Sequence, residues 1–220
     1  MSSLPHPAPF DPLPLVKEWL DAAGAGGRRN PNAMALATSD ANGRPSVRMV
    51  LLKGFAVSDG YAVFFTHYGS RKAAELGNGH AAGVLYWEEL GRQVRFEGIV
   101  VRSPAAESDA YFATRPPRSQ LNAWSSEQSK VLTDPAELTM RAARKAREFG
   151  WRDDDTSSAQ MRPLPRPDFW GGYRLWLDAL ELWVEGADRF HERLRYTRAL
   201  QPIDPHMFHG GAWAHQRLQP

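Results

Sequence analysis

The chain has 220 residues, of which 42% are hydrophobic, so it can form one sizeable globular domain. It contains no cysteine, which excludes disulfides, thiolate zinc sites and a cysteine nucleophile, and which fits a reducing compartment. The 27 basic and 25 acidic residues nearly balance, which argues against a protein that binds nucleic acid through a basic surface.

Hydrophobic periodicity and turn residues predict the elements in chain order. We expect residues 1–11, which are rich in proline, to form a flexible arm, and residues 12–220 to form a single domain. The first half is predicted to contain a helix over 12–25, strands over 33–38, 46–55 and 61–67, a helix over 70–76, and strands over 81–86 and 93–102. Asn42-Gly43 favours a tight hairpin between the first two strands.

The second half begins with predicted helices over 104–114 and 135–149, each with proline near its first turn. A polar, proline-rich mobile loop is expected over 152–167. Strands follow over 173–184, 191–198 and 213–218, with a loop containing proline, histidine and glycine over 200–211. Short strands with inserted helices predict a mainly β fold, a closed antiparallel barrel with flanking helices.

The sequence also bears on location. No apolar run approaches the ~20 residues of a membrane-spanning helix. The first ten residues lack the basic and apolar regions of a secretory signal. We therefore expect a cytoplasmic protein that does not insert into a membrane.

The segment 111–120, YFATRPPRSQ, places a phenol, a guanidinium and a hydroxyl at Tyr111, Arg115 and Ser119. Residues four apart share one face of a helix, or of a helix that runs into a turn. These groups donate hydrogen bonds and one is permanently cationic, so they suit the phosphate of a small molecule. The alternative is an ordinary amphipathic helix end that exposes polar groups.

Two further segments could bind an anion. Ser70, Arg71 and Lys72 begin a predicted helix directly after Thr66, and a helix N-terminus with a hydroxyl and cations attracts phosphate. The alternative is a solvated basic helix start. Arg48 and Lys53 lie on opposite faces of an ideal strand because their spacing is odd, although a bulge near Gly54 could bring both to one ligand.

Other polar positions give weaker indications. Gln93 could bind the edge of a heterocycle, and Gln128-Ser129 follows an irregular stretch, but both fit ordinary structural roles. Alternation on a strand would place Arg189, His191 and Arg193 on one side, where an anionic or electron-rich ligand would relieve their repulsion. The alternative is a charged strand edge that deters aggregation. The histidines are scattered, so no metal site is predicted, and there is no G-x-G-x-x-G motif or P-loop.

Taken together, these segments resemble the pyridoxamine 5′-phosphate oxidase family over nearly the whole chain. The resemblance rests on several segments in order, namely RMVLLKGF (48–55), FFTHYGSRK (64–72), GRQVRFEG (91–98), YFATRPPRSQ (111–120), AWSSEQS (123–129), WGGYRL (170–175) and RFHERLRY (189–196). It implies a split-barrel fold and a homodimer with FMN at the subunit interface.

The resemblance also implies the residues of the site. The FMN-binding set would be Arg48, Met49, Val50, Leu51, Leu52, Lys53, Phe65, Thr66, Arg71, Lys72, Gln93, Gln128, Ser129, Trp183 and Arg193. The substrate-binding set would be Lys53, Tyr111, Arg115, Ser119, Arg189 and His191, and the last two would be the catalytic pair. Trp183 comes from the resemblance alone, since its pattern indicates a core residue.

The chain departs from the family's pattern at three places. Phe65 stands where the family usually has tyrosine, the N-terminal arm is short and lacks an Arg-rich lead segment, and the 200–211 loop is longer than usual. The implied reaction is FMN-dependent oxidation of pyridoxamine or pyridoxine 5′-phosphate to pyridoxal 5′-phosphate, with oxygen as acceptor and hydrogen peroxide as product. The alternatives are a related flavin oxidase of the phenazine-biosynthesis type and a non-catalytic flavin- or haem-binding split barrel.

Overall fold

The computed structural model describes residues 3–151 and 161–220 of the chain, which form two compact units. The first, called the barrel unit here, comprises the chain up to Phe64 together with Glu75–Val101 and Tyr173–Pro220. The second, called the helical unit, comprises Phe65–Ala74 and Arg102–Gly172. Strands β3, β5 and β6 and helix α2 contribute residues to both units.

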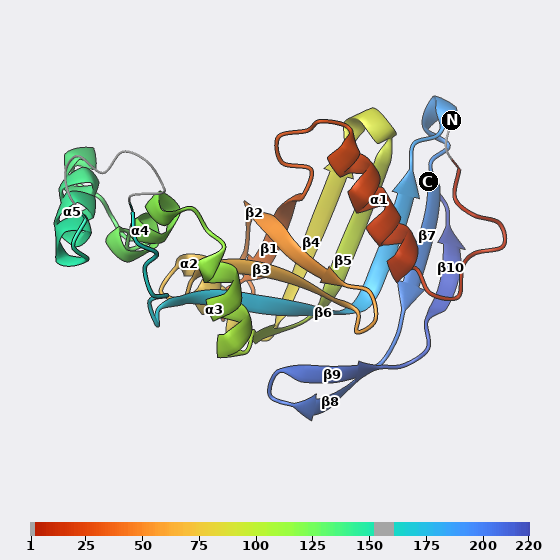
Figure 1. The fold of residues 1–220 in the computed structure, drawn as a ribbon. Helices are drawn as coiled ribbons and strands as arrows, with labels where there is room; N and C mark the ends of the chain where they lie inside the picture. Colours follow the sequence, from red (N-terminus) through yellow and green to blue (C-terminus); the bar gives the residue numbers. More distant parts are fainter. Residues whose placement is uncertain (1–2, 152–160) are drawn as a thin grey trace. The chain divides into compact units, whose positions relative to one another are not determined.

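The barrel is a six-stranded sheet that closes on itself (Figure 1). Its strands follow the order β6-β3-β2-β1-β4-β5, and β5 pairs back onto β6. Two further strands, β7 and β10, extend the sheet beyond β6. The strands are β1 (Ala33–Ser39), β2 (Pro45–Ala56), β3 (Tyr61–His67), β4 (His80–Trp87), β5 (Arg92–Arg102), β6 (Trp170–Val184), β7 (Glu192–Thr197) and β10 (Ala214–Leu218). The predicted mainly β antiparallel barrel is confirmed.

Alternating side chains fill the barrel interior. In β1 the buried positions are Met34, Leu36 and Thr38, and in β5 they include Val94 and Phe96. This period of two is what a strand with one face toward a core requires. The β1–β2 hairpin pairs Ser39 with Pro45, so the predicted Asn42-Gly43 turn lies at its tip.

Helix α1 (Leu13–Ala25) covers part of the barrel unit with one apolar face. Its buried residues Leu13, Val16, Trp19 and Ala23 recur at helical spacing. The guanidinium of Arg92, at the start of β5, lies 4.8 Å from the centre of the Trp19 ring. A 3₁₀ turn, η1 (Glu88–Leu90), joins β4 to β5, and another, η2 (Ala187–Arg189), precedes β7.

The helical unit is built from short helices. These are α3 (Ala105–Ala113), α4 (Pro117–Ser125) and α5 (Pro135–Glu148), and α2 (Arg71–Leu76) begins in this unit. Leu121, Trp151, Met161 and Leu164 form one buried cluster. A second cluster contains Phe112, Ala123 and Trp170, with Phe65 and Tyr111 packed against it.

One prediction about elements was wrong, and one helix was not predicted. The expected loop 200–211 is a hairpin of β8 (Leu200–Asp204) and β9 (Met207–Gly210), in which Pro202 pairs with Phe208. Proline is tolerated there because β8 and β9 form a separate two-stranded sheet, where an edge position needs no donor. Helix α4 was missed by the sequence analysis; Pro117 occupies its first turn, where proline is tolerated.

The N-terminal segment contacts the barrel unit. Leu4 is buried and its backbone N–H donates to Glu192, while the Tyr196 hydroxyl donates to the Pro9 carbonyl. The flexibility of this arm stays a prediction. Of the expected loop 152–167, residues 152–160 lie outside the described residues.

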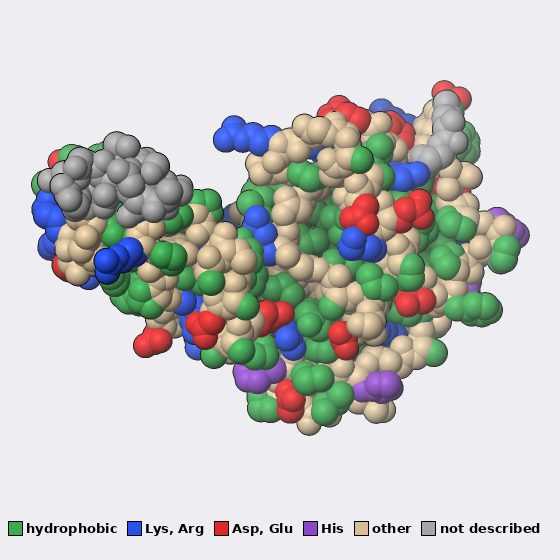
Figure 2. Space-filling model, viewed as in Figure 1, with side chains coloured by type: hydrophobic (Ala, Val, Ile, Leu, Met, Phe, Trp, Pro, Cys, Tyr) green, Lys and Arg blue, Asp and Glu red, His purple; other side chains and the backbone are tan. Residues whose placement is uncertain are grey.

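Neither sign of charge dominates the face of the molecule shown in Figure 2. Figure 2 shows acidic and basic side chains interspersed on the face in view, with Lys and Arg gathered over α5. Within the described part of the chain, no helix combines the length and the apolar character needed to cross a bilayer.

Candidate functional site

The predicted phosphate segment is divided between two helices. Tyr111 lies in α3, Arg115 lies in the link, and Ser119 lies in α4, so the three residues do not share one helix. Helix α3 ends because Thr114 caps it, with its hydroxyl donating to the Tyr111 carbonyl. The buried Gln120 fixes the bend, since its amide nitrogen donates to the Phe112 carbonyl, 3.0 Å away.

Arg115 nonetheless folds back toward Tyr111. Its guanidinium lies over the rings of Trp170 and Phe112, 4.7 and 5.3 Å from their centres. The buried nitrogen Nη1 has no hydrogen-bond partner among the described residues. Burial lowers the pKa of Arg115, and the nearby Tyr111 acts in the opposite direction. An arginine remains charged despite such a shift, so this site presents a cation with a vacant buried donor.

Three aromatic rings lie beside this arginine in nearly parallel planes. The centres of Phe65 and Tyr111 are 4.0 Å apart at 14°, and those of Phe65 and Trp170 are 5.6 Å apart at 8°. Gly172 allows this packing, because a Cβ there would lie 2.8 Å from Phe65 and 2.5 Å from the Ser103 hydroxyl. Trp170 was not among the predicted site residues, although its position before Gly171-Gly172 could have indicated a tightly packed ring.

A second polar cluster of the helical unit surrounds a buried lysine. The Lys72 ammonium donates to the Gln128 side-chain oxygen at 2.9 Å and to the Thr66 hydroxyl at 3.2 Å. The Thr66 hydroxyl also donates to Gln128 at 2.9 Å. Thr66 and Lys72 are only 5% and 8% exposed, so this cation is held within the fold. The structure therefore brings Gln128 to Thr66 and Lys72, which lie 62 and 56 positions earlier in the chain.

The neighbouring predicted residues lie at the surface. Arg71, Gln128 and Ser129 are exposed, and Ser119 is half-buried. Ser129 has a φ of 74°, in the left-handed region that non-glycine residues seldom adopt. Such backbone strain occurs often at binding sites, so the conformation of Ser129 is consistent with its predicted role in binding.

In the barrel unit, β2 places its predicted residues in different environments. The Arg48 guanidinium donates to Glu75 at 2.9 Å and to the Thr38 hydroxyl at 2.6 Å, so its charge is balanced internally. The strand register shifts between Leu52 and Gly54, next to Lys53, where the sequence allowed a bulge. Lys53, Met49 and Leu51 are exposed, Val50 is half-buried and Leu52 is buried.

The predicted cationic face of 189, 191 and 193 is only partly formed. Arg189 and His191 precede β7, so strand alternation does not apply to them, and only Arg193 lies in the strand. Asp188 and Arg189 have φ values of 53° and 66°, which turn the chain. The turn exposes Arg189, while the His191 ring centre lies 4.7 Å from that of Trp183. Trp183 is half-buried, which corrects its interpretation as a core residue.

Arg193 does not rely on a ligand for neutralisation. Its Nε and Nη2 donate to both oxygens of the Glu181 carboxylate, at 3.0 and 3.2 Å, which raises the pKa of Arg193. Glu181 is 3% exposed and also pairs with Arg95 at 3.5 Å. The repulsion argument for a ligand at this position was therefore wrong, since it ignored a carboxylate on a neighbouring strand. Gln93, the remaining predicted residue of this unit, lies half-buried in β5.

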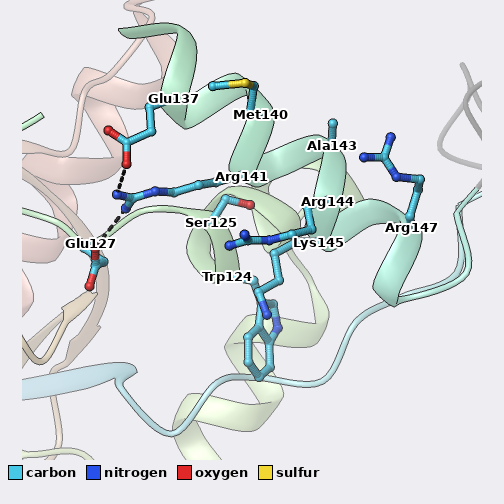
Figure 3. Close-up of a pocket in the computed structure, with 10 residues that line it drawn as sticks. All are labelled: Trp124, Ser125, Glu127, Glu137, Met140, Arg141, Ala143, Arg144, Lys145 and Arg147. Atoms are coloured by element: carbon cyan, nitrogen blue, oxygen red, sulfur yellow. Dashed lines mark hydrogen bonds and ion pairs between the residues drawn. The ribbon is translucent and has the colours of Figure 1, made fainter. Parts of the chain in front are cut away.

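A further cavity lies between α4 and α5 in the helical unit. It has a volume of about 860 Å³, and none of the predicted site residues lines it. Figure 3 shows Arg141 pointing between Glu127 and Glu137, to which it donates at 2.8 and 2.5 Å. Internal ion pairs therefore occupy the acidic side of this cavity.

Comparisons with known proteins assign the chain to a family. Residues 20–146 match the family model described as "Pyridoxamine 5'-phosphate oxidase". The chain belongs to the pyridoxamine 5′-phosphate oxidase family. It is an oxidoreductase of this family, and residues 170–220 match a second model, described as the "Pyridoxine 5'-phosphate oxidase C-terminal dimerisation region". The resemblance seen in the sequence is thereby confirmed.

Individual relatives agree with this assignment. A pyridoxine/pyridoxamine 5′-phosphate oxidase of Rubrobacter xylanophilus is 44% identical over 96% of this chain and 87% of its own. The corresponding protein of Paraburkholderia phymatum is 45% identical over 96% and 90%. Among solved structures, PhzG from Burkholderia lata in complex with tetrahydrophenazine-1-carboxylic acid has a TM-score of 0.80 and 34% identity, covering 96% of this chain and 94% of that one.

Proposed function

We propose that this chain oxidises pyridoxamine 5′-phosphate or pyridoxine 5′-phosphate to pyridoxal 5′-phosphate, with FMN as cofactor. Oxygen accepts the electrons and leaves as hydrogen peroxide. The amine substrate additionally consumes water and releases ammonia. Family membership supports this reaction, and one structural observation favours a phosphorylated substrate, namely the vacant buried donor of Arg115 beside Tyr111.

The substrate phosphate is bound in this proposal by Tyr111, Arg115, Ser119 and Lys53. Arg115 contributes a planar guanidinium whose Nη1 is already desolvated. A buried donor without a partner costs free energy, and a phosphate oxygen would recover it. Charge-assisted hydrogen bonds to phosphate are among the stronger ones in proteins, so Arg115 would supply most of the affinity.

The residues of the helical unit fit the phosphate of FMN. Lys72 is a buried cation among the hydroxyls of Thr66 and Ser70 and the amide oxygen of Gln128. A dianion placed there would meet positive charge and hydroxyl donors, with the exposed Arg71 at the same helix start. We propose that the cofactor-binding set named from the resemblance, Arg48 through Lys53 and Arg193 included, holds FMN.

When bound, FMN would accept a hydride equivalent from the substrate C4′ carbon and pass the two electrons on to oxygen. The protein's own contribution is position and charge. Arg189 and His191 orient the substrate ring in this proposal. His191 is suited to this because its Nδ1 accepts from the Gly186 N–H, which fixes the ring next to Trp183.

We further propose that the protein is a homodimer in the cytoplasm. The match of residues 170–220 to a dimerisation region supports the first point. The barrel unit also exposes Val47 and Met49 of β2, at 69% and 63%, and Met49 lines a groove of about 500 Å³ together with Val84 and Tyr86. Exposed apolar side chains along a groove are typical of protein interfaces.

The test is to purify the protein, record its absorption spectrum for bound flavin and measure peroxide release with pyridoxine 5′-phosphate. A yellow protein that turns over this substrate supports the proposal. The likeness to PhzG favours one other candidate, a flavin oxidase acting on a reduced phenazine precursor. Turnover of that precursor without turnover of pyridoxine 5′-phosphate would replace the proposed substrate. Bound flavin with neither activity would indicate a non-catalytic module.

A further inference from the structure

Trp170 lies next to two of the residues predicted to bind the substrate phosphate, Arg115 and Tyr111. It is 8% exposed and belongs to the same buried cluster as Phe112 and Ala123. The centre of its ring lies 4.7 Å from the guanidinium carbon of Arg115. The same centre lies 6.2 Å from the centre of the Tyr111 ring, and the two ring planes are inclined by 9°. One indole therefore contacts both side chains that the proposed function places on the substrate phosphate.

The surroundings hold this indole in place. Trp170 packs edge-on against Phe112 at 5.1 Å and nearly parallel to Phe65 at 5.6 Å. The backbone carbonyl of Trp170 accepts from the Arg166 guanidinium at 2.7 Å, and the backbone N–H of Trp170 donates to the Pro167 carbonyl at 3.0 Å. Since backbone and ring are both fixed, the indole can serve as a rigid support.

The support is needed because Arg115 lies in the link between two helices. Its guanidinium has no carboxylate to hold it, as no ion pair of Arg115 is formed within the described residues. A carboxylate would compete with a substrate phosphate, whereas an aromatic face attracts the cation and leaves its N–H groups available. An indole binds a cation more strongly than a phenyl ring does.

We propose that Trp170 is a positioning residue for substrate binding, which acts by holding the Arg115 guanidinium ready for the substrate phosphate. The inference rests on the proposed function and adds a residue outside the predicted sets. It commits to a phosphorylated substrate, because the positioned group is a cation with a vacant donor. Trp170 itself touches neither the phosphate nor the reacting carbon in this proposal.

A mutant cycle with Arg115 tests this role. W170L should raise KM for pyridoxine 5′-phosphate about tenfold while kcat changes less, because the support for a phosphate-binding cation is lost. W170F should give a smaller rise. In an R115A background, W170L should raise KM no further, since the group it positions is already absent.

The matched control is Trp124→Leu, in the same unit. The Trp124 ring contacts Phe149 and Phe169, and its N–H donates to the Pro165 carbonyl. Its loss should leave KM unchanged, even where the unfolding temperature falls as much as in W170L. If W170L does not fold, the cycle is run with W170F, whose rise in KM should likewise vanish with R115A.

The outcomes distinguish a failure of the positioning role of Trp170 from a failure of the proposed function. Independent effects of W170L and R115A on KM, or a fall in kcat alone, would overturn the positioning role and leave the proposed function intact. A wild-type protein that does not oxidise pyridoxine 5′-phosphate would overturn the proposed function together with the positioning role.

Discussion

Replacing Arg115 with alanine separates substrate binding from folding. The variant removes a guanidinium with one buried, vacant N–H and two aromatic contacts. A hydrogen bond to a charged group contributes about 1.5–3 kcal/mol, so loss of the phosphate contact should lower kcat/KM for pyridoxine 5′-phosphate roughly tenfold to a hundredfold. The loss should appear mainly in KM.

The same change should affect stability little. Removing the unsatisfied N–H relieves a penalty of about 1–3 kcal/mol, which offsets the loss of cation–π contacts of about 0.5–2 kcal/mol. We therefore expect the free energy of unfolding to stay within about 1 kcal/mol of wild type. FMN affinity should also change little, because Lys72 and Thr66 remain.

The assays are peroxide release over a range of substrate concentrations, flavin fluorescence for FMN affinity, and urea unfolding. Arg118→Ala is the control, because Arg118 is exposed three residues further on. It should retain most of the catalytic efficiency. An unaltered kcat/KM in R115A would remove Arg115 from the site, and an equal loss of FMN binding would show that the two phosphates are not bound by separate residues.

Three further predictions concern the fold around the site. Gly172→Ala should destabilise the protein by about 1–3 kcal/mol, because the new Cβ would overlap the buried Ser103 and the half-buried Phe65. Glu181→Gln should cost about 1–3 kcal/mol, since the bidentate pair with Arg193 is partly exposed and so weaker than a fully buried one. His67 should make stability depend on pH. Burial lowers its pKa from 6.5, and its Nδ1 accepts from a backbone N–H, so stability should fall as the pH drops below about 6.5.

Urea unfolding checks all three. Gly24→Ala is the control for the glycine, because nothing lies within 4 Å of its added Cβ and the helix should gain up to about 1 kcal/mol. Equal effects of the two glycine variants would contradict the packing argument. Glu127→Gln, at an exposed pair, should cost less than about 1 kcal/mol, and a cost equal to that of Glu181→Gln would refute the role of burial. His67→Gln should flatten the acid limb, and an unchanged pH profile would exclude His67 as its source.

Local patterns in the sequence determined most of the barrel. Alternation in 33–38 and 93–102, and the Asn42-Gly43 turn, predict strands and a hairpin because these depend on neighbouring residues. The same is true of helix α1. Where local rules compete, prediction failed: Pro116-Pro117 can end one helix or begin another, and Pro202 can occupy a loop or an edge strand.

The family, too, was recognisable from the order of short segments, whereas the role of each charged side chain was not. Arg193 and Glu181 lie on adjacent strands, and Arg48 meets Glu75 from another element, so no spacing rule pairs them. Tertiary structure alone placed Trp170 beneath Arg115, 55 positions earlier in the chain, and left that arginine with a vacant donor. Whether a cation is neutralised or available depends on partners brought by folding, and sequence distance carries no record of them.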